Sequence, residues 1–223
     1  MTIEQNEIWK VLFNRQRKNI EEYACKEFRE GLERMAFNPE QIPTIGELNQ
    51  KLRGCGWTIT NTRVRYLTAL QWARFIGKGK FPVTTYLRSR DELDFTPEPD
   101  MFHDIFGHLP FLLHQDTLRL VNLFASKMLT SDKQTIEKII AKLWWFTIEF
   151  GLVREDGEIK ALGAGLMSSF GEIRHIAGAN NRDFTITAAI HENPAVYSFH
   201  DGYFVIDSVA ALTRELENYF KTI

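Results

Sequence analysis

The first 36 residues carry apolar side chains at a spacing of three to four positions, with charged residues between them. This spacing is typical of an amphipathic α-helix, in which one face packs on a core and the other meets water. The apolar positions are Ile8, Leu12, Ile20, Ala24, Phe28, Leu32 and Met35. They predict one long helix over residues 4–36 that stops near Asn38 and Pro39, because proline cannot continue a helix.

Residues 44–87 alternate between helical and extended patterns. Thr44 and Glu47 have the spacing of a capping box, which predicts a helix that opens at Thr44 and ends at Gly54 or Gly56. Periodicity and β-branched composition then predict three elements, namely a strand over residues 57–64, a helix over 67–76 and a strand over 81–87.

The second half of the chain is also predicted to be mainly helical. Its expected elements are a helix around residues 118–128, a helix from a cap at Ser131 to about residue 150, a hairpin that turns at Asp156 and Gly157, and helices that open at Ser169 and Ser208. No repeat, low-complexity segment or linker interrupts the pattern. The predicted fold class is therefore mostly α with a few short β-strands, in a single domain over residues 1–223.

Composition and charge narrow the range of partners. The chain has 223 residues, 44% of them hydrophobic and 25% charged, and a formal net charge of −2 at pH 7. This balance gives no electrostatic reason to expect nucleic acid or an anionic membrane as a partner. The N-terminus does not resemble a secretory signal, and no apolar run is long enough to span a bilayer. Cys25 and Cys55 are too few for a disulfide framework, which indicates a cytoplasmic protein.

Two histidines lie close together in the segment TPEPDMFHDIFGHLP, residues 96–110. His103 and His108 are separated by about 140° around an ideal α-helix, so a regular helix would not aim both rings at one point. Gly107 and Pro110 weaken regular helix near the second ring, and a distorted or terminating turn would let His108 swing towards His103. A lone buried histidine is usually a core residue, whereas a converging pair indicates a metal site.

A third candidate ligand is Glu149, the only charged residue in the segment LWWFTIEFGL, residues 143–152. A buried carboxylate needs a partner, which can be a metal ion, an arginine or lysine, or water at a helix end. Two imidazoles and one carboxylate suit ferrous iron with open positions for oxygen and substrate. Zinc accepts the same ligands, so residue type alone favours iron only weakly.

Three segments together resemble a known family. The run FPVTTYLRSRDELDFTPEPDMFHDIFGHLP, followed by WWFTIEFGL and GAGLMSSFGE, closely resembles the pterin-dependent aromatic amino acid hydroxylases, and most closely their bacterial phenylalanine-hydroxylating members. In weaker form the resemblance extends from IWKVLFNRQ near the N-terminus to YFVIDS near the C-terminus. The resemblance implies the catalytic fold of that family and a mononuclear Fe(II) site formed by His103, His108 and Glu149.

The resemblance also implies roles for residues around the metal. Arg88 would pair with the substrate carboxylate, although taken alone it could form a surface salt bridge with Asp91 or Glu92. The other implied substrate contacts are Thr96 and Ser168, which would hold the amino acid, and Pro99 and Trp145, which would line the pocket for the aromatic ring. A reduced pterin would lie near Leu67, Trp72 and Asp104.

The family implies a cytoplasmic monooxygenase that uses Fe(II), O2 and a tetrahydropterin to hydroxylate the ring of a free aromatic amino acid. Phenylalanine to tyrosine is the leading case, with a role in phenylalanine catabolism. The chain has no room for regulatory or tetramerisation domains, so a monomeric catalytic core is expected. Two alternatives remain at this point. The adjacent His103 and Asp104 also match HD-type metal-dependent phosphohydrolases, and a non-catalytic homologue could retain the metal.

Overall fold

Helices dominate the computed structural model, which describes residues 1–62, 64–94, 96 and 98–223. The α-helices are α1 (Ile3–Tyr23), α2 (Lys26–Met35), α3 (Ile45–Lys51), α4 (Ala69–Ile76), α5 (Gln115–Thr130), α6 (Lys133–Thr135), α7 (Ala141–Trp144), α8 (Ala164–Ser168), α9 (Phe170–His175), α10 (Ile186–His191) and α11 (Val209–Phe220). Three π-helical turns are η2 (His103–His108), η4 (Ile136–Ile140) and η5 (Trp145–Glu149). Short 3-10 turns are η1 (Arg90–Glu92), η3 (Leu109–Leu113) and η6 (Ile176–Gly178). The mostly α fold class is confirmed.

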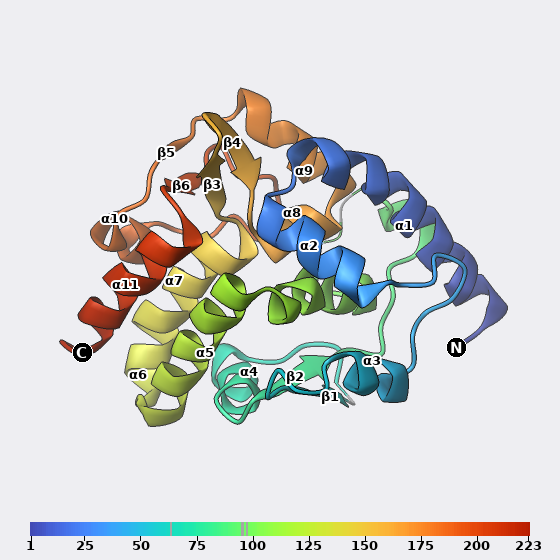
Figure 1. The fold of residues 1–223 in the computed structure, drawn as a ribbon, viewed down its shortest axis with the longest axis horizontal. Coiled ribbons are helices and arrows are strands. Elements are labelled where there is room, and N and C mark those ends of the chain that lie inside the picture. The colour runs from blue at the N-terminus through green and yellow to red at the C-terminus, as the bar shows by residue number, and fades with distance from the viewer. Residues whose placement is uncertain (63, 95, 97) are drawn as a thin grey trace.

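The strands form two small sheets at opposite edges of the molecule (Figure 1). They are β1 (Thr58–Asn61), β2 (Lys80–Val83), β3 (Leu152–Glu155), β4 (Glu158–Ala161), β5 (Arg182–Asp183) and β6 (Phe204–Ile206). β1 and β2 pair in parallel, with Thr58 opposite Lys80. The larger sheet has the order β4-β3-β6-β5, in which β3 and β4 are antiparallel and β6 runs parallel to both β3 and β5.

The long N-terminal helix predicted over residues 4–36 is instead two helices. α1 ends at Tyr23, and Ala24 adopts an extended conformation before α2 begins at Lys26. At this break the Cys25 amide donates to the Ala161 carbonyl at 2.9 Å, and Ala24 forms an isolated bridge with Ala161. The tertiary contact with β4 therefore satisfies the backbone groups that a continuous helix would have used. The apolar stripe is preserved across the break, because Ile20, Ala24 and Phe28 are all buried.

Most other elements lie where the sequence places them. Thr44 caps α3 through a capping box with Glu47, although the helix ends at Lys51, before the predicted glycines. β1 is shorter than the predicted strand, whose residue 63 lies outside the described residues. The predicted cap at Ser131 is wrong by one position, because the Asp132 side chain accepts from the Thr135 amide instead.

Later elements follow the prediction closely. The helical run that begins at Asp132 continues to Glu149 through η4, α7 and η5. Asp156 and Gly157 both have positive φ, 51° and 84°, which is the conformation required by a tight turn between β3 and β4. Ser169 and Ser208 cap α9 and α11 as expected.

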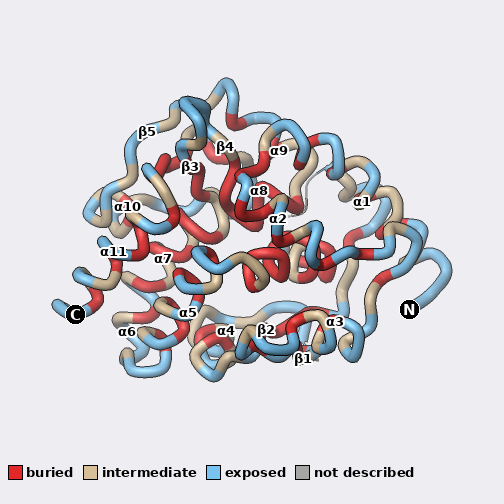
Figure 2. Tube along the Cα trace, in the orientation of Figure 1, coloured by how far each residue is buried: buried red, intermediate tan, exposed pale blue. Residues whose placement is uncertain are grey.

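Buried residues concentrate at the centre of the molecule (Figure 2), and most of η2 and η3 is buried. There Phe102 stacks on Phe106 with ring centroids 4.7 Å apart, and Trp9 and Phe28 from the first two helices pack against this pair. Close packing of this kind fixes the backbone of η2 in one position. None of the helices in the described part of the chain has both the length and the apolar character needed to span a membrane.

Candidate metal centre and its cavity

A π-helical turn explains the unusual spacing of His103 and His108. The two histidines are the first and last residues of η2. A π-helix has hydrogen bonds between residues five apart, so residues at that spacing lie one above the other. The sequence predicted a distortion at this place but attributed it to the end of a helix near Gly107 and Pro110. The structure instead shows a wide turn across the whole motif.

Gly107 is required by packing at this turn. A Cβ atom at this position would lie 2.7 Å from the Ala164 carbonyl oxygen of α8, which is closer than any real contact of that kind. α8 therefore rests directly on the backbone of η2. This contact holds Ser168, at the end of α8, beside His103.

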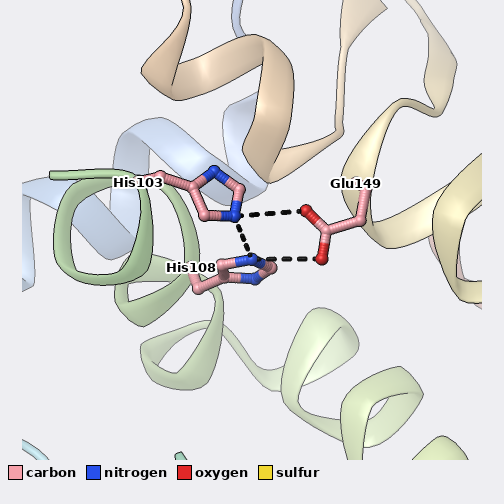
Figure 3. Close-up of side chains that lie close together, drawn as sticks. All are labelled: His103, His108 and Glu149. Carbon is pink, nitrogen blue, oxygen red and sulfur yellow. Dashed lines mark hydrogen bonds and ion pairs between the residues drawn. The ribbon is translucent and has the colours of Figure 1, made fainter. Parts of the chain in front are cut away.

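Glu149 is the last residue of another π turn, η5, and its carboxylate faces the two histidine rings (Figure 3). His103 Nε2 and His108 Nε2 are 3.0 Å apart, and Glu149 lies 3.5 Å from the first and 3.2 Å from the second. Ligands about 2.1 Å from one ion at roughly right angles would themselves be about 3 Å apart. We call His103, His108 and Glu149 the candidate metal cluster, and its spacing fits a divalent cation.

The electrostatics of the candidate metal cluster favour the metal-binding protonation states. Burial, together with the nearby His108 charge, lowers the pKa of His103 to about 4. Burial alone would raise the pKa of Glu149, but the two histidines and a hydrogen bond from Trp144 outweigh it and lower that pKa to about 2. At neutral pH His103 is therefore neutral and Glu149 is ionised. Among the described residues, Glu149 forms ion pairs only with these histidines, so the arginine and lysine alternatives for it are wrong.

Ser168 fixes the tautomer of His103. Its hydroxyl donates to the carbonyl oxygens of Ala164 and Gly165 at 3.0 and 3.2 Å, and it lies 2.9 Å from His103 Nδ1. When the hydroxyl hydrogen is used on these carbonyls, Ser168 accepts from His103 Nδ1–H. The lone pair of His103 is then on Nε2, which faces the cluster. The sequence suggested Ser168 only as a substrate contact and gave no sign of this bond.

Trp144 supports the carboxylate in the same way. Its indole nitrogen donates to Glu149 Oε1 at 2.5 Å, and its ring meets the edge of Trp72 at a centroid distance of 4.6 Å. A donor directed at a ligating carboxylate restricts its orientation and favours its charged form. The sequence did not predict this contact, because residues 144 and 149 face each other only in the widened turn η5.

Arg88 is buried, with 1% of its surface exposed, and it pairs with Asp100 rather than with Asp91 or Glu92. Its Nε and Nη2 atoms donate to the two Asp100 oxygens at 2.8 and 2.9 Å, and Nη1 donates to the Ser168 carbonyl at 3.2 Å. Burial would raise the pKa of Asp100, but the Arg88 charge outweighs it and lowers that pKa. The surface salt-bridge alternative for Arg88 is therefore wrong.

Asp104 lies beside the candidate metal cluster but is not part of it. Its Oδ2 accepts from the Thr84 amide at 2.8 Å. Burial raises the pKa of Asp104 to about 7, although the Thr84 hydrogen bond and the His108 charge lower it. An HD-type phosphohydrolase would use the adjacent His and Asp together as ligands, and this arrangement does not provide that.

One cavity of about 300 Å³ adjoins the candidate metal cluster and is lined by every residue that the sequence singled out. These residues are Leu67, Trp72, Arg88, Thr96, Pro99, His103, Asp104, His108, Trp145, Glu149 and Ser168. Further lining residues that the sequence did not suggest include Tyr66, Thr84, Phe150, Glu172 and Val196. These additional residues come from several segments of the chain, and the sequence alone does not show that the segments meet at one cavity.

Comparisons with known proteins agree with this geometry. A family model described as biopterin-dependent aromatic amino acid hydroxylase matches residues 1–223. The chain is 33% identical over 228 residues to the chloroplastic phenylalanine 4-monooxygenase of Pinus taeda, which covers 100% of this chain and 63% of the pine protein. It is 32% identical over 213 residues to the phenylalanine-4-hydroxylase of Chromobacterium violaceum, covering 94% of this chain and 71% of that protein.

The fold matches solved structures of similar proteins. A crystal structure of Chromobacterium violaceum phenylalanine hydroxylase with bound iron(III) and 7,8-dihydrobiopterin aligns with a TM-score of 0.89 at 28% identity. This alignment covers 100% of the present chain and 82% of that chain. The correspondence therefore includes the segments that form the cavity.

Proposed function

The chain belongs to the biopterin-dependent aromatic amino acid hydroxylases, and from this membership we propose that it is an Fe(II)- and tetrahydropterin-dependent monooxygenase that converts phenylalanine to tyrosine. The observation that carries the proposal is the convergence of His103, His108 and Glu149 in the lining of a cavity of about 300 Å³. Family membership excludes the HD-type phosphohydrolase alternative.

The candidate metal cluster would hold the iron. Two neutral imidazoles and one carboxylate on one side of the ion leave its other positions open to the cavity, which is the ligand pattern of non-haem Fe(II) oxygenases. Ser168 and Trp144 orient two of the three ligands through the hydrogen bonds described above. The iron and a reduced pterin, when bound, supply the reductive activation of O2 that ring hydroxylation requires.

Arg88 is suited to the substrate carboxylate even though Asp100 already occupies part of its guanidinium. A guanidinium has five N–H groups, and the described partners use one on each of its three nitrogens. One N–H therefore remains on Nη1 and one on Nη2, the pair that can bind a carboxylate bidentately. Asp100 holds these two donors in place, so the substrate meets a charge that is already oriented.

The walls of the cavity would hold the rest of the substrate. Thr96 and Ser168 offer polar contacts in the cavity wall, while Pro99 and Trp145 offer flat apolar surfaces for the ring. Placement of the ring beside the open side of the candidate metal cluster is the main task of these residues, because correct positioning lowers the barrier of the chemical step. The same apolar walls exclude water from the reacting groups.

The pterin would lie near Leu67, Trp72 and Asp104, which also line the cavity. Leu67 and Trp72 present apolar surface to a flat heterocycle, and the Trp72 ring is itself braced by Trp144. Asp104, whose pKa is raised to about 7, can exchange hydrogen bonds with ring nitrogens in either protonation state.

The test is a reconstitution experiment. The purified protein is loaded anaerobically with Fe(II), then mixed with tetrahydropterin, air and each aromatic amino acid in turn. Tyrosine formation from phenylalanine, coupled to pterin oxidation, is the expected result. Absence of any hydroxylated product with every amino acid would overturn the proposal and favour the non-catalytic homologue.

We further propose that the protein acts as a monomer in the cytoplasm. The free thiols of Cys25 and Cys55 fit a reducing compartment. Sedimentation of the purified chain at several concentrations tests the oligomeric state, and a concentration-dependent dimer would contradict it.

A further inference from the structure

A second buried cluster lies directly behind the wall of the cavity. His200, Glu172, Tyr203 and Trp145 form it, and we call it the His200 cluster. His200 is 5% exposed, and Glu172 and Tyr203 are each 2% exposed. Glu172 Oε1 accepts from His200 Nδ1 at 2.8 Å and from the Tyr203 hydroxyl at 3.1 Å. On the other side of the imidazole, Trp145 Nε1 lies 3.1 Å from His200 Nε2.

The donors and acceptors of the His200 cluster permit only one arrangement. An indole N–H can only donate, so His200 Nε2 must be the unprotonated acceptor. The proton of neutral His200 is then on Nδ1, where it is donated to Glu172. The Glu172 carboxylate therefore fixes the tautomer that the Trp145 indole requires.

Trp145 and Glu172 both line the cavity, whereas His200 lies behind them. The Trp145 ring also packs on Phe150 at a centroid distance of 4.8 Å, and Phe150 in turn packs on the His200 ring at 4.4 Å. Packing of this kind limits how far the indole can tilt, but only the bond to His200 fixes which edge of the indole faces away from the cavity.

His200 also connects two separate parts of the cavity wall. Trp145 belongs to η5, whereas Ala195, Val196 and Ser198 line the cavity from the segment that leads to His200. The backbone amide of His200 lies 3.3 Å from Glu172 Oε1, so both the main chain and the side chain of this residue are anchored to the same carboxylate. A change at residue 200 would therefore affect both walls together.

We propose that His200 is a positioning residue that holds the Trp145 indole against the wall of the cavity and so sets the space available to the substrate ring. This inference rests on the proposed function, because it assigns Trp145 to the ring pocket. Without the bond, the indole is free to turn its polar edge into the cavity, which narrows the pocket and exposes an unpaired donor to an apolar ring.

Two substitutions at this position separate the hydrogen bonds from the packing. His200→Gln places a carbonyl acceptor and an amide donor at positions similar to the two ring nitrogens, so it can maintain both bonds. His200→Phe keeps an aromatic ring in the cluster and removes both bonds. The matched control is Tyr203→Phe, which removes a donor to the same Glu172 oxygen without touching Trp145.

A spectroscopic measurement tests the bond independently of activity. The chain has five tryptophans, and a Trp145→Phe variant assigns the indole N–H signal of Trp145 in nitrogen-15 correlation spectra of the full-length zinc-loaded protein. We expect the Trp145 signal to be protected from solvent exchange in the wild type, His200→Gln and Tyr203→Phe, and to exchange at least about 10-fold faster in His200→Phe. An unchanged exchange rate in His200→Phe would overturn the proposal.

A kinetic measurement tests the consequence for the substrate. With the iron-loaded protein, His200→Phe should raise the KM for phenylalanine by about 3- to 10-fold and change kcat by less than about 3-fold, while His200→Gln restores the wild-type KM. Equal KM values in all variants of an active enzyme would overturn the inference. An inactive wild type would instead overturn the proposed function, and the exchange measurement would still decide whether the bond exists.

Discussion

Two clusters in this molecule each combine buried histidine with buried glutamate, yet only one has the geometry of a metal site. In the candidate metal cluster, both Nε2 atoms and both Glu149 oxygens face one another at 3.0 to 3.5 Å. In the His200 cluster, every one of the short contacts joins a donor to an acceptor, from Trp145 to His200 and from His200 and Tyr203 to Glu172.

The two clusters differ in how many hydrogens the protein supplies between their polar atoms, and not in the types of residue that they contain. Around Glu172, the protein itself supplies the hydrogens that satisfy the carboxylate and the imidazole. Around Glu149, Trp144 supplies one hydrogen, and the Nε2 atoms of both histidines converge on the carboxylate oxygens. When both Nε2 atoms are unprotonated, these converging acceptors are stabilised by a cation. A buried His–Glu pair therefore indicates a metal site only when its lone pairs are left unmatched.

The largest effect that would test this contrast comes from removing a ligand. Glu149→Ala should abolish stoichiometric iron binding and lower hydroxylation at least about 1,000-fold, because the metal provides several kcal/mol of transition-state stabilisation. Iron content by elemental analysis and tyrosine formation are measured on the same sample. His191→Ala, at an exposed histidine that does not line the cavity, is the control. Full iron occupancy in Glu149→Ala would show that this carboxylate is not a ligand.

The next largest effect concerns Arg88, which lies in the same cavity but carries a charge matched by Asp100. Arg88→Lys retains the buried positive charge and loses the forked geometry, so the two free N–H groups no longer bind a carboxylate together. We expect the KM for phenylalanine to rise by about 10- to 100-fold, with unchanged iron content. A proportionate loss of iron would mean that the residue supports the metal instead of the substrate.

The sequence predicted the candidate metal cluster better than it predicted the shape of the backbone that forms it. His103, His108 and Glu149 stand out because each is a polar residue in an apolar segment, and burial of such residues requires a partner. The π turns η2 and η5 do not stand out, because no local pattern separates them from α-helix. They depend on tertiary contacts such as that of Gly107 with Ala164.

Dependence on contacts that are distant in the sequence also explains the other differences between the predicted and the observed structure. The break between α1 and α2 depends on Ala161, which is far along the chain, so the local periodicity of residues 4–36 could not reveal it. His200 alone looks like an ordinary core histidine, and its role emerges only when Glu172 and Trp145 are placed on either side of it. Capping signals at Thr44, Ser169 and Ser208 were reliable because both partners lie within one turn.

A pH-dependent effect would test the raised pKa of Asp104, which lies beside the candidate metal cluster and is shifted mainly by burial. In the unfolded chain Asp104 is ionised above its ordinary pKa of 3.8, whereas in the folded, metal-free protein its pKa is about 7. The folded state therefore binds more protons between these values, so the wild type loses stability as pH rises from about 4 to 7. The difference in free energy of unfolding between Asp104→Asn and the wild type should therefore shift in favour of the variant by on the order of 2 kcal/mol from pH 5 to pH 8.

Urea denaturation of both metal-free proteins at the two pH values measures that gain, and bound Zn²⁺ should reduce it because a cation stabilises the ionised Asp104. An equal difference in stability at pH 5 and pH 8 would contradict the raised pKa.

Glu172→Gln tests the same contrast in the His200 cluster. The substitution weakens the three hydrogen bonds to a buried carboxylate without removing a ligand, so the free energy of unfolding should fall by about 1 to 2 kcal/mol while iron content stays at the wild-type level. The paired variant Glu149→Gln should give the reverse pattern, with metal lost and the stability of the metal-free protein nearly unchanged. Loss of iron from Glu172→Gln would break the distinction between the two clusters.

The smallest effect should come from Trp144, which among the described residues makes the only hydrogen bond to the Glu149 carboxylate beyond those of the histidines. Trp144→Phe keeps an aromatic ring against Trp72 and Phe124 and removes only the indole donor. The carboxylate then reorients more freely, and we expect Fe(II) affinity to fall by about 10-fold with little change in the free energy of unfolding. Competition with a chelator of known affinity measures the change.

The same substitution at Trp57, whose indole donates to Asn122 far from the ligands in sequence, should leave the Fe(II) affinity unchanged. If both variants weakened iron binding equally, the effect would come from general loosening of the fold, and the unmatched lone pairs would not need the Trp144 donor.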